Sequence, residues 1–177
     1  MTPPSAVIRS ARGSEVVAAG RRLLEEEGPE ALTMRRLAER LGIRAPSLYK
    51  HLPDKAALEA AIIATGFEEA AAAFEAAVDG AAEALPALVA AYRRFALAHP
   101  HLYRLMNNGP LPREHLPPGL EDRTAAPILR AAGGRARARA VWAFAHGKVM
   151  LELDHRFPAD ADLDAAWRAG IAAFQPG

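Results

Sequence analysis

Apolar residues recur along this chain every three or four positions, with polar residues between them. Val17, Leu23 and Leu24 share one face of a helix that Ser14 can cap and Gly28 can end. No stretch of useful length alternates between apolar and polar residues, which is the pattern of a half-buried strand. The spacing therefore predicts an all-α protein.

The residues that follow predict three further helices, and capping residues mark their boundaries. Thr33 can cap a second helix, and Gly42 stands where a residue with positive φ commonly ends one. A short third helix is predicted over 46–51, and Asp54 can cap a fourth over 55–78. The first three helices have the lengths and short connections of a small N-terminal domain.

The second half of the chain has helical periodicity as well. Pro100 separates two of its helices, and the Pro- and Gly-rich run 109–119 predicts a loop. The helices predicted here cover residues 82–99, 100–108, 120–132, 135–157 and 162–174. We expect an N-terminal domain over 13–60, preceded by a flexible arm over 1–12 and followed by a larger helical domain over 61–177.

Composition excludes several classes of protein. The chain has no cysteine, so it has no disulfides, thiolate metal sites or cysteine nucleophiles, and it fits a reducing cytoplasm. No apolar run approaches the roughly 20 residues that span a bilayer, and the first residues contain no apolar signal-peptide core. We therefore expect a cytoplasmic protein with no membrane partner.

The positive charge of the chain is concentrated in one segment. The formal net charge is only +1, but residues 31–55 contain six Lys and Arg against two Asp and Glu, a local charge of +4. From residue 66 onward, twelve basic residues face thirteen acidic ones. A basic cluster on a near-neutral body is a distribution typical of nucleic-acid-binding proteins.

The same segment has the spacing of a helix-turn-helix. Ala38 is small enough for two helices to cross, Gly42 supplies the turn, and Leu48 faces the core from the third helix. This arrangement leaves the other face of the third helix outside, where it can enter a major groove of DNA. Lys50 and Arg44 can reach base edges or phosphates from that face.

Residues 10–62 resemble the DNA-binding domain of the TetR (tetracycline repressor) family. The matching features are Leu32-Thr33, Leu37-Ala38, Leu41-Gly42, the run Leu48-Tyr49-x-His51, and Lys55-x-x-Leu58. By position, the resemblance implies phosphate contacts for Thr33, Tyr49, His51 and Lys55. It implies contacts with bases or nearby backbone for Arg35, Ala45, Pro46, Ser47 and Lys50.

Two residues of this segment depart from the family pattern. Leu52 stands where the family usually has Phe, and we interpret it as a packing residue. Ala45 occupies a position often held by a polar residue, and it offers only a methyl contact, for example to thymine.

The C-terminal half resembles the TetR C-terminal domain type named WHG, through Trp142, His146 and Gly147. The resemblance implies a domain that senses a ligand and forms a homodimer through its last two long helices. Trp167 and Phe174, seven positions apart on the last helix, are predicted to lie in the core of that interface.

Several large side chains of this half are candidates for an effector pocket, and ordinary core packing is the alternative for each of them. These candidates are Tyr92, Phe95, Leu102, Met106, Trp142, His146 and Met150. A hydrogen-bonded core position is the alternative reading for His146 in particular. His99 and His101 point to different sides of a helix, so we expect no metal site, and nothing in the sequence indicates a cofactor.

Three functions are compatible with these observations. The first is a dimeric repressor that binds a palindromic double-stranded operator and is released by a small, apolar effector. The second is a related activator or DNA-binding protein without an effector. The third, a helical enzyme, has little support, because no phosphate-binding loop, nucleophile motif or pair of catalytic carboxylates is present.

Overall fold

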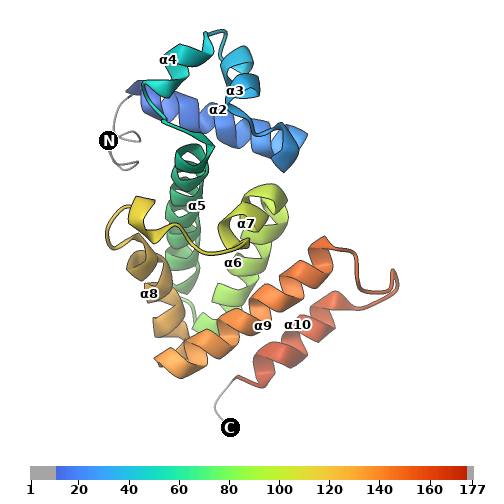
Figure 1. Ribbon diagram of the computed structural model, residues 1–177. Coiled ribbons are helices and arrows are strands. Elements are labelled where there is room, and N and C mark those ends of the chain that lie inside the picture. Colours follow the sequence, from blue (N-terminus) through green and yellow to red (C-terminus); the bar gives the residue numbers. More distant parts are fainter. Residues whose placement is uncertain (1–10, 175–177) are drawn as a thin grey trace. The chain divides into compact units, whose positions relative to one another are not determined.

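The computed structural model describes residues 11–174, and every element in that range is a helix or a connection between helices (Figure 1). The all-α prediction is therefore confirmed. The α-helices are α2 (Ala11–Glu27), α3 (Met34–Arg40), α4 (Ala45–Tyr49), α5 (Lys55–Val78), α6 (Ala84–Ala98), α7 (Pro100–Asn107), α8 (Leu120–Ala132), α9 (Arg135–Leu153) and α10 (Leu163–Ala172). Two short 3₁₀ helices are η1 (Pro29–Ala31) and η2 (Arg113–His115).

The chain forms two compact units that divide within α5. Unit 1 comprises Met1–Glu68 and His99–Leu120, and unit 2 comprises Glu69–Ala98 and Glu121–Gly177. Unit 1 thus contains α7 and η2 in addition to the helices predicted for the N-terminal domain. The first ten residues of the predicted arm lie outside the described residues, and its last two belong to α2.

The helices of unit 1 pack through a core of leucines. Leu23, Leu37, Leu48, Leu58 and Leu102 are each 0 % exposed, and they come from α2, α3, α4, α5 and α7 respectively. Fully burying such a side chain contributes about 1.5–3 kcal/mol of apolar transfer free energy. The core therefore holds the short helices α3 and α4 against α2 and α5.

Local capping sets most helix boundaries where the sequence predicts them. The Thr33 hydroxyl accepts a hydrogen bond from the Arg36 N–H at 3.1 Å, and Asp54 accepts one from the Ala57 N–H at 2.8 Å. The prediction for Ser14 is wrong, because α2 already includes Ala11 and places Ser14 inside the helix. An Arg12–Glu15 ion pair of 2.8 Å supports this earlier turn.

Helix α7 is attached to unit 1 by both polar and apolar contacts. The Glu25 carboxylate of α2 accepts a hydrogen bond from the Leu102 N–H at 3.1 Å, and so caps the first turn of α7. Gly66 of α5 faces the same helix, since a Cβ there would lie 2.6 Å from the Met106 sulfur and 3.1 Å from Leu102. A larger residue would have to displace these two side chains, so glycine permits the close packing of α5 and α7.

Unit 2 packs its aromatic residues in two groups. Phe74 of α5 stacks on Tyr92 at 5.6 Å between ring centroids and meets Phe95 edge-on at 6.4 Å. Phe144 of α9 packs against Trp167 at 5.5 Å and Phe174 at 5.6 Å. The second group fixes α10 against α9.

A polar network also holds α10 in unit 2. Arg93 of α6 donates hydrogen bonds to Glu152 of α9 at 3.0 Å and to Asp164 of α10 at 2.5 Å. The Trp167 indole N–H donates to the same Glu152. The hydrogen bond from Arg93 lowers the pKa of the Asp164 carboxyl below its usual value.

Two expectations for the C-terminal helices need correction. Helix α9 ends at Leu153, four residues before the end of its predicted range, because His155 turns the chain with a φ of 49°. Trp167 is only 4 % exposed within its own chain, so the prediction that it lies in an intermolecular interface is wrong. Its ring is already covered by Phe144 and by the Arg93 guanidinium, 5.6 Å from the ring centroid.

Within residues 11–174, no helix combines the length and the apolar character needed to cross a bilayer.

Candidate nucleic-acid interface and effector site

The turn between α3 and α4 is fixed by backbone hydrogen bonds around Gly42. The Gly42 N–H donates to the Glu39 carbonyl at 3.1 Å, and the Ile43 N–H donates to the Ala38 carbonyl at 3.0 Å. These are the paired bonds of a Schellman motif, which requires a left-handed residue after the helix. Gly42 has a φ of 63°, as the sequence predicts. The motif sets the direction in which the chain enters α4.

Helix α4 buries one side and exposes the other. Leu48 and the following Leu52 are 0 % exposed, which confirms the interpretation of Leu52 as a packing residue. Tyr49 is 50 % exposed, and Lys50 beside it is also exposed. An aromatic ring and an ammonium group on the outer face contribute little to packing, so they remain available to a partner.

The structure brings most of the predicted contact residues to the surface of unit 1. Exposed among them are Thr33, Arg35, Arg44, Pro46, Ser47, Tyr49, Lys50 and Lys55, whereas Ala45 and His51 are half-buried. Two of the cations have acidic neighbours one turn away. Arg35 pairs with Glu39 at 3.0 Å and Lys55 pairs with Glu59 at 3.3 Å. Such exposed pairs are worth about 0.3–0.5 kcal/mol, so both cations can exchange them for phosphate.

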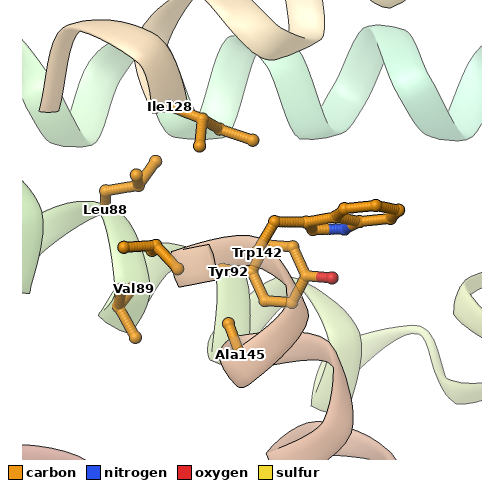
Figure 2. A pocket seen from close by; sticks show the side chains of 7 residues that line it. Leu88, Val89, Tyr92, Ile128, Trp142 and Ala145 are labelled. Atoms are coloured by element: carbon orange, nitrogen blue, oxygen red, sulfur yellow. The ribbon is translucent and has the colours of Figure 1, made fainter. Parts of the chain in front are cut away.

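A hollow in unit 2 lies among α6, α8 and α9 (Figure 2). Its volume is about 220 Å³ when space open to solvent is included. The residues that line it are Leu88, Val89, Tyr92, Ile128, Val141, Trp142 and Ala145. Trp142 is 48 % exposed, so one side of the hollow is an accessible indole ring.

The seven predicted pocket residues are distributed over both units, and only Tyr92 and Trp142 line this hollow. Leu102 and Met106 belong to unit 1, where they pack against Gly66. His146 lies next to Trp142, with 6.3 Å between ring centroids, and its burial lowers the pKa of its imidazole.

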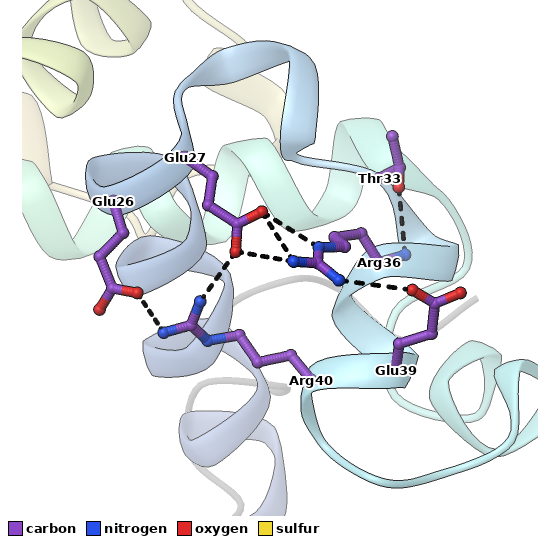
Figure 3. Close-up of polar contacts among 6 residues, drawn as sticks. All are labelled: Glu26, Glu27, Thr33, Arg36, Glu39 and Arg40. Atoms are coloured by element: carbon purple, nitrogen blue, oxygen red, sulfur yellow. Dashed lines mark hydrogen bonds and ion pairs between the residues drawn. The ribbon is translucent and has the colours of Figure 1, made fainter.

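Sequence reasoning missed two features of these candidate sites. The first is the wall of the hollow formed by Leu88 and Ile128, whose spacing is that of ordinary core positions. The second is a pair of acids, Glu26 and Glu27, that bind arginines of α3 (Figure 3). A signal for these acids was present, because carboxylates at a helix C-terminus are electrostatically unfavourable unless cations neutralise them.

The fold of unit 1 and its exposed α4 define a DNA-binding protein of the helix-turn-helix class. Residues 16–62 match the family model described as bacterial regulatory proteins, tetR family. Residues 85–174 match the model described as tetracyclin repressor-like, C-terminal domain, and this match alone covers half of the chain. The chain therefore belongs to the TetR family, whose members are transcriptional regulators and not enzymes.

Individual relatives agree with this assignment. Tetracycline repressor protein class G of Vibrio anguillarum is 54 % identical over 43 residues, 24 % of this chain and 20 % of that protein. An HTH-type transcriptional regulator of Mycobacterium tuberculosis is 26 % identical over 125 residues, 68 % of this chain and 52 % of that protein. The chain thus spans about half the length, or less, of these relatives.

A solved structure supports the same fold along nearly the whole chain. A single-residue variant of TetR from Acinetobacter baumannii AYE, in complex with minocycline, superposes with a TM-score of 0.62. It is 26 % identical, and the match covers 91 % of this chain and 92 % of that one.

Proposed function

We propose that the protein is a dimeric transcriptional repressor that binds a palindromic operator through α4 and is released by a small, apolar effector. The observation that carries the DNA-binding part is the division of α4 into a buried side, with Leu48, and an exposed side, with Tyr49 and Lys50. A recognition helix needs this division, because one side anchors it while the other enters the major groove.

Each predicted contact residue, exposed or half-buried, has a role in this proposal. The residues assigned to phosphate are Thr33, Tyr49, His51 and Lys55, and those assigned to bases or adjacent backbone are Arg35, Arg44, Ala45, Pro46, Ser47 and Lys50. Hydroxyls donate to phosphate oxygens without adding charge, whereas Lys and Arg also recognise guanine in the major groove.

Support for a homodimer comes from the exposed faces of the last two helices. Small residues recur at helical spacing on both, namely Ala136, Ala140, Ala143 and Gly147 on α9 and Ala166, Ala169 and Ala173 on or just beyond α10. Small side chains allow helices to approach closely, and a two-fold axis would place the same face on both partners. A dimer of this kind would present two copies of α4 to the two half-sites of a palindrome.

Support for an effector comes from the hollow beside Trp142. Its lining side chains are apolar apart from the Tyr92 hydroxyl and the Trp142 indole N–H, and the lowered pKa of His146 favours a neutral imidazole nearby. These properties favour a neutral, apolar molecule. Its binding would have to differ between the DNA-binding and released states by about 1–3 kcal/mol to act as an inducer.

The size of the hollow favours a second candidate, a TetR-family DNA-binding protein that acts without an effector. The space that it encloses is only about 10 Å³, room for about one water molecule and far below the roughly 300–1,000 Å³ of most ligand pockets. An effector would therefore have to be small or would have to widen the hollow as it binds.

Both proposals, with and without an effector, include a cytoplasmic location for the protein.

The DNA-binding proposal is tested by selecting duplexes from a randomised pool with the purified protein. We expect the wild type to enrich a palindrome and the double variant Tyr49→Ala, Lys50→Ala to enrich nothing above background. Arg123→Ala is the control, because it removes an exposed cation from unit 2 and should leave the enrichment unchanged. Equal enrichment by all three proteins would exclude α4 as the reading element.

The effector proposal is tested with the selected duplex and a panel of small neutral aromatic compounds. Binding in the hollow should quench the fluorescence of Trp142 and leave that of the buried Trp167 unchanged. A compound that quenches Trp142 should also weaken DNA binding. If none of the panel does either, the candidate without an effector is preferred.

A further inference from the structure

Four charged side chains connect the end of α2 with α3 in unit 1 (Figure 3). Arg36 forms a two-pronged contact with the Glu27 carboxylate, with Nε at 3.1 Å and Nη2 at 3.0 Å from Oε2, and Nη2 also 3.2 Å from Oε1. Arg40 donates to Glu27 at 3.3 Å and to Glu26. Two arginines one turn apart are therefore held by two adjacent carboxylates of another helix.

This cluster compensates the negative charge at the C-terminal end of α2. The helix ends in three consecutive glutamates and has no basic residue in its last turn. The C-terminal end of a helix has a partial negative charge, so these carboxylates repel it unless cations are supplied from elsewhere. Arg36 and Arg40 supply them from the face of α3 that lies against α2.

The same cluster limits what the two arginines can do toward DNA. Arg40 is only 28 % exposed at its side chain, and its guanidinium is shared by two carboxylates. Arg36 has a second acidic neighbour, Glu39, at 3.7 Å. By contrast, the Arg35 side chain on the outer face of α3 is 90 % exposed and meets a single carboxylate. Among the three arginines of this helix, Arg35 is thus the most exposed, against 50 % for the Arg36 side chain.

We propose that Arg36 and Arg40 are positioning residues, which orient α3 and the turn into α4 by binding Glu26 and Glu27, and that neither neutralises a DNA phosphate. This inference rests on the proposed DNA-binding function. It reduces the basic surface that faces DNA to Arg35, Arg44, Lys50 and Lys55, although six cations are present in the segment 31–55.

In the competing account, both arginines bind phosphate. The two accounts predict opposite changes in DNA affinity for one substitution. Glu27→Gln removes a negative charge and frees the two arginines, so that account predicts tighter DNA binding. The positioning account predicts weaker binding, because α3 loses its main ionic attachment to α2. Glu30→Gln is the matched control, since it removes the same charge from an exposed site three residues further along.

The experiment measures the affinity and its salt dependence for the duplex selected by the wild type and for a duplex of mixed sequence. For Glu27→Gln we expect about fivefold weaker binding to the selected duplex than for Glu30→Gln, which is the upper range for an exposed ion pair. The slope of log K against log salt should stay at the wild-type value for Arg36→Gln and Arg40→Gln. For Lys55→Gln, which removes a cation assigned to phosphate, it should fall by about 0.9, the change for one lost phosphate contact.

A charge exchange separates positioning from phosphate binding. Glu26→Arg combined with Arg40→Glu restores the ion pair with its signs reversed, so affinity should recover relative to Arg40→Glu alone. The proposal would be overturned if Glu27→Gln bound the selected duplex as tightly as Glu30→Gln, or more tightly. It would also be overturned by a slope reduced by about 0.9 in either arginine variant.

Failure of the proposed function gives a different result. In that case the wild type binds neither duplex, and amide hydrogen exchange of unit 1 still tests the positioning role. Glu27→Gln should then speed exchange along α3, including the Leu37 and Leu41 N–H groups, whereas Glu30→Gln should not. Equal exchange in the two variants would overturn the proposal without any DNA.

Discussion

Replacing Gly42 with Ala tests whether the turn between α3 and α4 is built as described. Gly42 has a φ of 63°, and a Cβ at this position would have no heavy atom within 4 Å. Steric clash therefore contributes nothing, and the cost is that of a left-handed L-residue alone, about 1–2 kcal/mol. For a chain of this size, that corresponds to a decrease in Tm of about 2–8 °C.

Gly80 supplies a matched control for this change. It has a φ of 69°, and it too has open space around the Cβ position, but it lies in unit 2. Thermal unfolding followed by circular dichroism should show similar destabilisation for Gly42→Ala and Gly80→Ala. Only Gly42→Ala should also weaken binding to the selected duplex, since it alone alters the entry into α4.

The substitution Gly42→Asn should cost less than Gly42→Ala, because asparagine enters the left-handed region more readily. If Gly42→Ala is neutral, or more stable by the roughly 0.4–1 kcal/mol expected where alanine fits the backbone, the described turn is wrong. Equal weakening of DNA binding by both glycine variants would also refute the role of this turn in placing α4.

Three further predictions concern unit 2. Gly170→Ala should lower the free energy of unfolding in urea by about 1–3 kcal/mol, because its Cβ would overlap the Phe144 ring. Adding Phe144→Leu should relieve most of this cost. A Gly170→Ala variant as stable as the wild type would contradict the described packing. Wild type should lose stability relative to His146→Gln as the pH falls below about 6.5. The reason is that the imidazole of the unfolded chain takes up a proton, whereas the partly buried imidazole of the folded protein has a lowered pKa. Parallel profiles of unfolding free energy against pH for the two proteins would contradict this. Ala143→Arg, on the exposed side of α9, should convert the dimer to a monomer in sedimentation velocity with no loss of secondary structure, whereas an unchanged dimer would exclude this face.

The elements predicted correctly from the sequence are those with local causes. Thr33, Asp54 and Asp162 cap helices because a side chain reaches an N–H three residues away, and this relation is visible in the spacing. Gly42 is predictable for the same reason, since its conformation depends on the chain immediately before it. Leu48 follows from the period of the core positions.

The features that escaped prediction have partners far along the chain. Glu27 and Arg36 are nine residues apart, and Arg93 and Asp164 are 71 apart, so neither pair is visible as a spacing. Counting charges in the segment 31–55 overestimates the basic surface, because the carboxylates that bind two of its arginines lie just before it. The interface prediction for Trp167 failed because the sequence shows its position on the helix but not the residues that cover its ring.

The predicted effector pocket shows the same limit. Tyr92 and Trp142 line one hollow, but Leu102 and Met106 belong to the other unit. Large apolar side chains at helical spacing look alike in a sequence, whether they fill a core or border a cavity. Only the packing of α6, α8 and α9 shows which of these side chains fill the core and which border the hollow.

The most direct test of the central claim is to map where α4 lies on the DNA. The chain contains no cysteine, so Ala45→Cys creates a single attachment point for an iron-chelate that cleaves DNA within its reach. On the selected duplex we expect two symmetric clusters of cleavage, centred about 10–10.5 base pairs or a multiple of that apart. Arg123→Cys, in unit 2, is the control for cleavage from elsewhere on the protein. Three results would contradict the claim that a dimer reads its operator through this helix. The Ala45→Cys reagent would give no cleavage, or a single cluster in place of two, or cleavage no stronger than that of the Arg123→Cys control.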